Sequence, residues 1–396
     1  MNLARELTGL ERLRPVLDAL PGPAFLVGGT VRELLLGHPS RFDFDLAVVG
    51  DGESFARALA ERLGGRVTTH GRFGTATVNY GDAARVDVAT ARTETYPAPA
   101  ALPDVAPAAS IEEDLARRDF TINAMAISLP DGELVDPFHG RQHLEEQLVR
   151  VLHEGSFVDD PTRIFRAVRY ETRLGFRLDP KTETLSLIAR PELRRLSGAR
   201  VREELIALLE EDEAPAAVQR LQQLGVDAAL HPGLSFREGR LVARLRELAS
   251  RYHLPRERWE LGLLAIAPPP GWLDELKFPR VVVERVERAV SEAPALRTHL
   301  RGSWLAPAEV VDAIERTGAD TPLLALAQED LPLLRDYFER WRNVRLELTG
   351  DDLAALGLGE SPRVGEVLAE LRRRKLNGGL SGRAEELAAA RELISE

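Results

Sequence analysis

Hydrophobic positions follow two different periods, and the change between them divides the chain into two parts. In the first part, short apolar runs rich in β-formers predict strands. These runs are AFLV (24–27), DFDLAVV (43–49), GRVTT (65–69), FGTATVNY (73–80) and RVDVATA (85–91). Two amphipathic segments between them, TVRELLLG (30–37) and ESFARALAERL (53–63), have the period of helices. This part therefore predicts a small mixed sheet with helices.

The second part is helical. Strand patterns nearly vanish after about residue 141, and helical patterns then follow one another to the C-terminus, with breaks at HPGLSF (231–236) and IAPPPGW (266–272). The whole chain predicts an α+β fold, in which an N-terminal head with a sheet is followed by all-helical parts.

Two segments connect the parts. Residues 93–110, TETYPAPAALPDVAPAAS, have no period and predict a mobile or partly extended loop. Residues 111–127, IEEDLARRDFTINAMAI, predict a helix with acidic residues in its first turn, as the helix dipole favours. The triplet RRD (117–119) would lie about two turns into that helix.

Composition narrows the class of protein. The 396 residues are enough for about two to four domains. The chain has no cysteine, which excludes disulfides and cysteine-ligated zinc and fits a reducing compartment. No signal peptide is recognisable, and no run approaches the roughly eighteen apolar residues of a membrane span. We therefore expect a cytoplasmic protein that does not contact membranes.

Charge is unevenly distributed. The formal net charge of −11 argues against a protein that coats nucleic acid non-specifically. Basic residues nevertheless cluster in RIFRAVRYETRLGFR (163–177), RRLSGARVR (194–202) and RRRK (372–375). An arginine-lined channel on an acidic body would suit a phosphate backbone.

The run DFDLAVV carries two carboxylates on one face, because side chains alternate along a strand and Asp43 and Asp45 therefore point the same way. Like charges at this spacing repel unless a cation neutralises them or they lie in water. The pair is therefore consistent with a metal site or with a strand end that is exposed to solvent. Asp87, in RVDVATA, is a candidate third carboxylate or a solvated strand charge.

Two glycines precede the helical segment 30–37. Gly28 and Gly29 would leave backbone N–H groups open to an anion at the helix start, with Arg32 about one turn further on. A phosphate cradle close to a carboxylate pair predicts one ligand that carries both phosphate and a divalent metal. Mg-nucleotide is the simplest candidate.

Four motifs occur in order over roughly residues 20–210. They are LVGGTVRELLLG with DFDLAVV, RRDFTINAMA (117–126), DPFHG (136–140) and DDPTRIFRAVRYETRLGF (159–176). Together they closely resemble the class II tRNA nucleotidyltransferases, the CCA-adding enzymes, and the related bacterial poly(A) polymerases of the DNA polymerase beta superfamily. The C-terminal helices resemble the family only in their length and helical character.

The resemblance implies a head, neck, body and tail. Their expected bounds are 1–140 for the catalytic head, 141–208 for the neck that recognises the base, 209–330 for the body and 331–396 for a tail that binds tRNA. It also implies the reaction, in which the tRNA 3′-hydroxyl attacks the α-phosphate of CTP or ATP and pyrophosphate leaves. Asp43 and Asp45 would bind two Mg2+ ions, and Asp87 matches a third catalytic carboxylate of the superfamily.

The resemblance implies nucleotide-binding roles for further residues. Gly28, Gly29 and Arg32 would bind the triphosphate. Arg118 and Asp119 match a motif associated with the ribose, where a donor and an acceptor on one helix would favour ribonucleotides.

The stretch DDPTR (159–163) allows two interpretations. Asp160 before Pro161 fits a helix N-cap with proline at the first helical position. In the family the corresponding motif is a protein template for the base. Asp160 and Arg163, one turn apart, would present a hydrogen-bond acceptor beside a donor. This pair complements cytosine and adenine, whereas uracil or guanine would leave its polar groups without hydrogen bonds.

Two positions depart from the family pattern. Asp159 stands where glutamate is usual, and Ala199 stands where a glutamate commonly precedes the arginine of a bracing neck helix. The first change shortens a supporting carboxylate but spares the Asp160 and Arg163 edge, and the second lies in a segment expected to be structural. Arg166 and Arg169 continue the same helix, where they would contact phosphate or pair with acids.

Within the family four activities compete. A full-length loop between residues 92 and 117 counts against CC addition alone, and the C-terminus lacks the basic extension expected of poly(A) polymerases. CCA addition from CTP and ATP therefore comes first. Addition of A alone is next, since the loop has few charged residues with which to reorder the site between the two nucleotides. An A-adding enzyme would need a separate CC-adding partner.

The motifs argue against two other classes of protein. A non-catalytic RNA-binding protein would not need a carboxylate pair that repels phosphate, and a DxD glycosyltransferase would not need the RRD and DDPTR motifs. Because the partner expected is tRNA, held at its acceptor end and elbow, the tail cluster is a candidate contact. It comprises Arg372, Arg373, Arg374 and Lys375.

Overall fold

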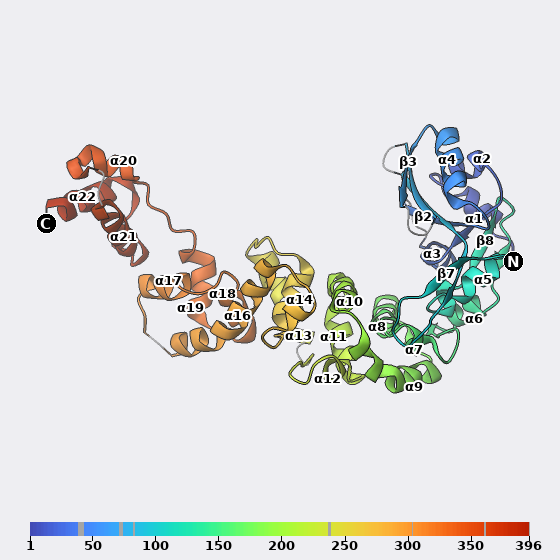
Figure 1. Cartoon of the computed structure of the whole chain (residues 1–396). Coiled ribbons are helices and arrows are strands. Elements are labelled where there is room, and N and C mark those ends of the chain that lie inside the picture. The colour runs from blue at the N-terminus through green and yellow to red at the C-terminus, as the bar shows by residue number, and fades with distance from the viewer. Residues whose placement is uncertain are drawn as a thin grey trace. The chain divides into compact units, whose positions relative to one another are not determined.

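The computed structural model of the chain describes residues 1–38, 43–70, 74–81, 84–236, 239–302, 304–359 and 362–395. It divides into two compact units, unit 1 (Met1–Pro232) and unit 2 (Gly233–Glu396), which are coloured from blue to yellow-green and from yellow to red in Figure 1. The sheet lies in unit 1, and the described residues of unit 2 form helices and their connections. The expected α+β class is therefore confirmed, while the finer bounds at residues 140, 208 and 330 remain predictions.

A mixed sheet forms the N-terminal part of unit 1. Its described strands lie in the order β3-β4-β5-β2-β1-β8-β9, with β2 and β5 parallel and the other neighbours antiparallel. They are β1 Ala24–Val27, β2 Asp43–Val48, β3 Arg66–His70, β4 Thr75–Tyr80, β5 Ala84–Thr90, β8 Ala126–Leu129 and β9 Leu134–Val135. The five strands expected from the apolar runs are thus all present.

Helices surround and follow the sheet in unit 1. They are α1 Ala4–Thr8, α2 Arg14–Ala19, α3 Gly29–Leu35, α4 Gly52–Leu63, α5 Ile111–Ala116, α6 Gly140–Glu145, α7 Ser156–Asp159, α8 Arg163–Leu174, α9 Pro180–Ala189, α10 Gly198–Glu210, α11 Ala214–Gln223 and α12 Val226–Leu230. Shorter pieces are the 3-10 turns η1 Thr121–Asn123 and η2 Arg190–Arg195, and the strand pairs β6 Arg92–Thr95 with β7 Asp104–Pro107 and β10 Leu148–Val149 with β11 Arg177–Leu178.

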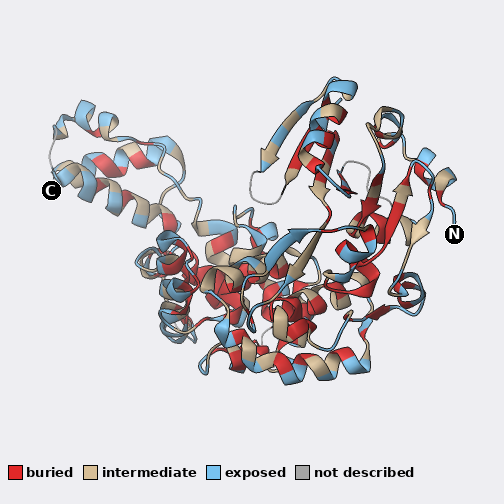
Figure 2. Ribbon diagram, turned by 45° about the vertical axis from the view of Figure 1, so that its right-hand side comes forward, coloured by how far each residue is buried: buried red, intermediate tan, exposed pale blue. Residues whose placement is uncertain are grey.

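Alternation along β2 separates the core from the polar face. Phe44 and Leu46 are almost fully buried in a core that includes apolar residues of α4. Buried residues are red in Figure 2. Ala47, on the other face, packs in a second apolar cluster with residues of α5. Asp43 and Asp45 share the face of Ala47, so the pleat keeps both carboxylates out of the main core.

The segment expected to be a mobile or partly extended loop contains most of a β-hairpin. β6 and β7 pair in antiparallel register, with Arg92 opposite Pro107 and Thr95 opposite Asp104. Cross-strand backbone hydrogen bonds hold this pairing, and they leave no periodic signal in a sequence rich in Pro and Ala.

The helix expected over residues 111–127 is shorter than predicted. α5 ends at Ala116, so the RRD triplet follows the helix and does not lie inside it. Ala126 begins β8, which pairs with β1. The prediction was wrong because a short apolar run fits a buried strand and a helix equally well.

Unit 2 is built from helices. They are α13 Gly239–Arg251, α14 Arg258–Ile266, α15 Trp272–Glu275, α16 Arg280–Leu300, α17 Pro307–Glu315, α18 Thr321–Gln328, α19 Pro332–Asp336, α20 Gly350–Leu353, α21 Pro362–Leu376 and α22 Gly382–Ser395, with the π-type turns η3 Tyr337–Trp341 and η4 Ala354–Leu358. Among the described residues of the chain, no helix has both the length and the apolar character needed to cross a bilayer.

Candidate active site

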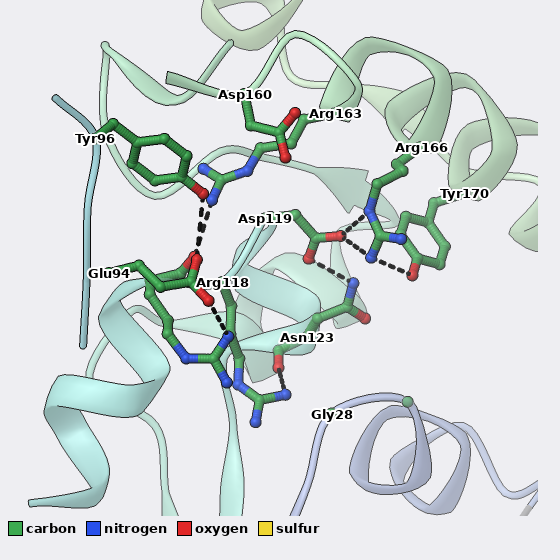
Figure 3. Close-up of a pocket in the computed structure, with 12 residues that line it drawn as sticks. Gly28, Glu94, Tyr96, Arg118, Asp119, Asn123, Asp160, Arg163, Arg166 and Tyr170 are labelled. Atoms are coloured by element: carbon green, nitrogen blue, oxygen red, sulfur yellow. Dashed lines mark hydrogen bonds and ion pairs between the residues drawn. The ribbon is translucent and has the colours of Figure 1, made fainter. Parts of the chain in front are cut away.

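Unit 1 contains a polar cavity of about 290 Å³ (Figure 3). Its lining residues are Gly28, Gly29, Glu94, Tyr96, Arg117, Arg118, Asp119, Asn123, Asp160, Arg163, Arg166 and Tyr170. In Figure 3, Glu94 and Tyr96 lie on one side of the cavity and Arg166 and Tyr170 on the other. Seven residues proposed from sequence come together here, although they lie far apart in the chain.

A second cavity, the carboxylate cavity, lies against the sheet and includes Asp45, Asp87 and Arg85 in its lining. Asp45 and Asp87 are opposite each other on the parallel strands β2 and β5, so their side chains lie on one face as neighbours. Desolvation by the surrounding protein atoms and, second, the negative charge of Asp87 raise the pKa of Asp45, while Arg118 lowers it. The residue nevertheless remains exposed to solvent. Asp43, on the same face, is exposed.

Asp87 already has partners within the sheet. Arg85 Nη2 and Thr77 Oγ1 both donate hydrogen bonds of 2.6 Å to its carboxylate. Over the described part of the chain, no group of three or more histidine and acidic side chains is placed to hold a metal ion. The strand register thus brings Asp87 beside Asp45, where Asp87 forms an ion pair with Arg85. The catalytic role of Asp87 remains a prediction.

Gly28 lies between β1 and α3, as expected, and has a φ of +68°, which favours glycine. A Cβ atom added there would lie 2.8 Å from Nη1 of Arg118. Gly28, Gly29 and Arg118 line both cavities, which therefore meet at these residues.

Arg118 is held by a carboxylate that the sequence interpretation missed. Asp114, only 1% exposed, accepts hydrogen bonds from Arg118 Nη2 at 3.0 Å and from Arg117 Nη2 at 2.9 Å. Burial alone would raise the pKa of Asp114, but the two arginines hold it below its usual value. The available signal was an acid four residues before an arginine at a helix end.

Asp119 is fully engaged with protein groups in this structure. Its Oδ1 accepts hydrogen bonds from Phe120 N at 2.8 Å and Asn123 Nδ2 at 2.9 Å, and its Oδ2 accepts two from Arg166, at 2.6 and 2.9 Å. A carboxylate has about four lone-pair sites, so a ribose hydroxyl would have to replace one partner. The predicted ribose contact of Asp119 stays a prediction.

Asp119→Asn should destabilise the protein in a pH-dependent way. Asp119 is buried, and although burial itself would raise its pKa, Arg166 and Asn123 lower it below the usual value. A lowered folded-state pKa adds stability above the unfolded-state pKa, and this stability is lost as pH falls through the folded-state pKa. We expect the Tm of the variant to be about 5 °C lower at pH 7. Calorimetry from pH 7 to about 3 should show the gap closing; a constant gap would contradict this account.

Arg32 lies behind the cavity. It is 3% exposed and donates to Asn123 Oδ1 and, at 2.7 Å, to Glu33 Oε1. Its guanidinium also lies 5.0 Å from the centre of the Tyr170 ring. Its hydrogen bond orients Asn123, which lines the polar cavity. Arg32 itself lines neither cavity, and its predicted contact with the triphosphate is untested.

Asp160 and Arg163 lie next to each other in the cavity wall, but not on one helix. Asp160 follows α7, and α8 begins at Arg163 with Thr162 as its N-cap residue. The expectation of Asp160 as the N-cap with Pro161 at the first helical position was therefore wrong by two residues. Asp160 instead accepts the Thr162 N–H at 3.0 Å, which closes a turn before the helix.

Arg163 is 4% exposed and is held by two protein acceptors. Its Nη1 donates to Ser156 Oγ at 2.6 Å and its Nη2 to the carbonyl of Arg117 at 2.9 Å. Of five guanidinium N–H groups, two are thus used. The arginine is fixed in direction and keeps donors for a ligand.

The remaining predicted arginines differ in their surroundings. Arg166 forms the ion pair with Asp119 described above, which fits the expectation that it pairs with an acid. Arg169 does not line the cavity, and its Nε is buried without a hydrogen-bond partner among the described residues. Its predicted nucleotide contact is untested.

The tail cluster on α21 is neutralised by acids. Arg372 pairs with Glu315 at 2.6 Å, and Lys375 pairs at 2.6 Å with Glu386, a fully buried residue. Arg373 and Arg374 also lie within 4 Å of carboxylates. These contacts give the cluster a structural function, and its predicted binding of tRNA remains a prediction.

Five residues of the cavity wall were not proposed as site residues from the sequence: Glu94, Tyr96, Arg117, Asn123 and Tyr170. Glu94 accepts hydrogen bonds from Arg117 at 3.0 Å and from Tyr96 at 3.2 Å, so it joins β6 to the RRD triplet. Polar and aromatic residues inside an otherwise apolar loop were the available signal for Glu94 and Tyr96.

Comparisons with known proteins agree with this geometry. Residues 24–150 match the model of the Poly A polymerase head domain, and residues 175–237 match that of a probable RNA and SrmB-binding site of polymerase A. An A-adding tRNA nucleotidyltransferase of Halalkalibacterium halodurans is 33% identical over 98% of this chain and 92% of its own length. One from Geobacter sulfurreducens is 35% identical over 96% of this chain, which spans 46% of that protein.

Other relatives include CC-adding and CCA-adding enzymes. The solved Thermotoga maritima CCA-adding enzyme, complexed with tRNA, superposes with a TM-score of 0.82 at 29% identity, over all of this chain and 98% of that one. With its ordered motifs, its two-cavity site and similarity along nearly its whole length, this chain belongs to the family of class II tRNA nucleotidyltransferases and bacterial poly(A) polymerases.

Proposed function

We propose that the chain is a tRNA nucleotidyltransferase that transfers AMP from ATP to the 3′ end of tRNA. In this reaction the terminal 3′-hydroxyl forms a bond to the α-phosphate, and the bond from that phosphate to pyrophosphate breaks. The proposal combines the site geometry with the names of the relatives.

One observation carries the proposal: the polar cavity and the carboxylate cavity share Gly28, Gly29 and Arg118. A nucleotide whose base lies near Asp160 and Arg163 would pass its phosphates along these shared residues toward Asp45. Open backbone at the glycines and the cation of Arg118 suit a triphosphate. In this proposal, the end of the ligand path that recognises the base and the end that binds metal are joined by these shared residues.

Base selection would rest on one free oxygen of Asp160 and the remaining N–H groups of Arg163. Among the described residues, every hydrogen bond to Asp160 reaches Oδ1, so Oδ2 is left as an acceptor. Adenine and cytosine offer an amino donor beside an unprotonated ring nitrogen, which complements an acceptor beside a donor. Guanine and uracil would leave these groups unpaired.

Asp43 and Asp45 are the residues that would hold divalent metal. Mg2+ in proteins is usually bound through one or two carboxylates together with substrate phosphates, so this donor set fits. Desolvation and the neighbouring charge of Asp87 raise the pKa of Asp45, and a bound cation would oppose both effects by favouring the ionised carboxylate. When bound, Mg2+ supplies positive charge that favours the ionised hydroxyl and the leaving pyrophosphate.

Addition of A alone is favoured over full CCA addition by two observations. The A-adding relatives are 35% and 33% identical over 96% and 98% of this chain, whereas a CCA-adding enzyme that matches 94% of it is 28% identical. The segment after β6 is also docked, since Ala100 hydrogen-bonds to Val158 and Arg200, which suits a site that keeps one shape for one base. CCA addition from CTP and ATP, favoured by the similarity to the CCA-adding structure, is the second candidate.

The direct test offers purified protein three labelled tRNA transcripts, ending before CCA, after C and after CC. Each is incubated with Mg2+ and with CTP alone, ATP alone or both. We expect only the CC-ended transcript to grow, by one A, so that a separate CC-adding enzyme must prepare its substrate. Extension of all three to CCA would establish the second candidate. If none is extended under any condition, the proposed function is wrong.

A further inference from the structure

We propose that Arg200, on α10, is a positioning residue that fixes Asp160 for base selection and links this to docking of the segment around Ala100. The inference rests on the proposed function, because it concerns which nucleotide is accepted. Neither Arg200 nor Ala100 lines the polar cavity. Arg200 would therefore act through Asp160 and not by contact with the nucleotide.

The first step is the asymmetry of the Asp160 carboxylate. Oδ1 accepts three hydrogen bonds, from Thr162 N at 3.0 Å, Thr162 Oγ1 at 2.6 Å and Arg200 Nη2 at 2.6 Å. No described residue donates to Oδ2. A carboxylate is planar, so three donors on one oxygen also fix the direction of the other. All three bonds are charge-assisted by the carboxylate, and the one from Arg200 carries charge on both the donor and the acceptor.

The second step is the other half of the same guanidinium. Arg200 Nη1 donates to the carbonyl of Ala100 at 2.9 Å, and the Ala100 N–H donates to the carbonyl of Val158 at 3.0 Å. Ala100 is buried and has a φ of +61°, a conformation that is strained for an L-residue. The two hydrogen bonds hold this conformation, and they tie the segment to α7, which ends just before Asp160, and to α10, which carries Arg200.

The third step is the rigidity of the support. Arg200 lies in the first turn of α10, a helix anchored by buried Val201, Leu205 and Leu208. Its side chain is 21% exposed, and that of Asp160 is 20% exposed. A planar guanidinium can donate to two acceptors in a fixed geometry, whereas a lysine ammonium cannot reproduce that fork. Arg200→Lys therefore keeps the charge and removes the link.

The test compares Arg200→Lys with Arg220→Lys. Arg220 has the same exposure, 20%, and braces α8 through Glu171 at 2.7 Å, but it does not contact Asp160. We measure kcat and KM for ATP and GTP with CC-ended tRNA, equilibrium binding of both nucleotides in Mg2+, and the Tm of each protein. Arg200→Lys should lower the preference for ATP over GTP about tenfold, while Arg220→Lys should leave it unchanged.

The outcomes separate this inference from the proposed function. Equal losses with ATP and GTP, or no change, would reduce Arg200 to a structural brace and overturn the proposal. If the wild type extends no tRNA, the proposed function fails. The inference about Arg200 is then tested by whether Arg200→Lys reduces the preference for ATP over GTP in equilibrium binding. A wild-type protein that binds ATP and GTP equally tightly overturns the inference in either case.

A second variant tests the link to the docked segment. Ala100→Pro removes the N–H donated to Val158, and proline cannot adopt a positive φ. It should lower the ATP preference to the same degree as Arg200→Lys, whereas Ala100→Gly, which tolerates this φ, should keep it. An Ala100→Pro variant with full selectivity would show that Asp160 is positioned without the segment.

Discussion

Asp45→Asn should lower AMP incorporation by about 10³-fold or more, the largest effect expected from a single substitution in this chain. Asparagine keeps the size of the side chain but removes the negative charge that would hold a cation beside the triphosphate. The loss should fall mainly on kcat, because that charge acts on the transition state. Single-turnover extension of CC-ended tRNA at saturating ATP and Mg2+ measures it.

Asp51→Asn is the matched control for this variant. Asp51 lies just after β2 and caps α4 through Ser54 N at 3.0 Å, and it lines neither cavity. Its activity should stay near that of the wild type. As a second readout, Mg2+ with ATP should raise the Tm of the wild type but not that of Asp45→Asn. Wild-type rates in Asp45→Asn would remove it from the metal site.

Asp87→Asn should cost less activity than Asp45→Asn, since Arg85 already neutralises Asp87 in the sheet. An equal loss in the two variants would instead support Asp87 as a third catalytic carboxylate.

Asp160→Asn should lower kcat/KM for ATP by about 10²- to 10³-fold and raise the relative use of GTP. Because Thr162 and Arg200 donate three hydrogen bonds to Oδ1, the amide oxygen of asparagine would take that place. The amide NH2 group would then replace Oδ2 and present a donor where adenine also presents a donor. Guanine offers a carbonyl at that position, which accepts from the amide.

Asp179→Asn provides the comparison for Asp160→Asn. Asp179 caps α9 through Thr182 N at 3.2 Å in the same unit and does not line the polar cavity. It should change the use of ATP and GTP by equal and small factors. Competition between the two labelled nucleotides in one reaction gives the ratio directly. An Asp160→Asn variant that still rejects GTP would show that another residue reads the base.

Local patterns were sufficient for much of the head. The alternation in DFDLAVV predicted correctly that Asp43 and Asp45 share a face of β2, and the glycines before α3 were placed correctly between strand and helix. These features depend on residues that are neighbours in sequence, so the alternation of a strand or the start signal of a helix is enough to predict them. The RRD triplet was wrongly placed inside a helix because the apolar run that follows it fits the pattern of a helix and of a buried strand equally well.

The α+β class, the five strands of the head, the family and seven residues of the polar cavity could be predicted from local patterns and motifs. Which atoms these residues offer to a ligand depends on the contacts that they make in the folded protein. Asp119 is occupied by Arg166, Arg163 by the carbonyl of Arg117, and Asp160 by Arg200. Each of these partners lies at least 40 residues away in the chain, and hydrogen bonds over such separations leave no periodic trace in a sequence.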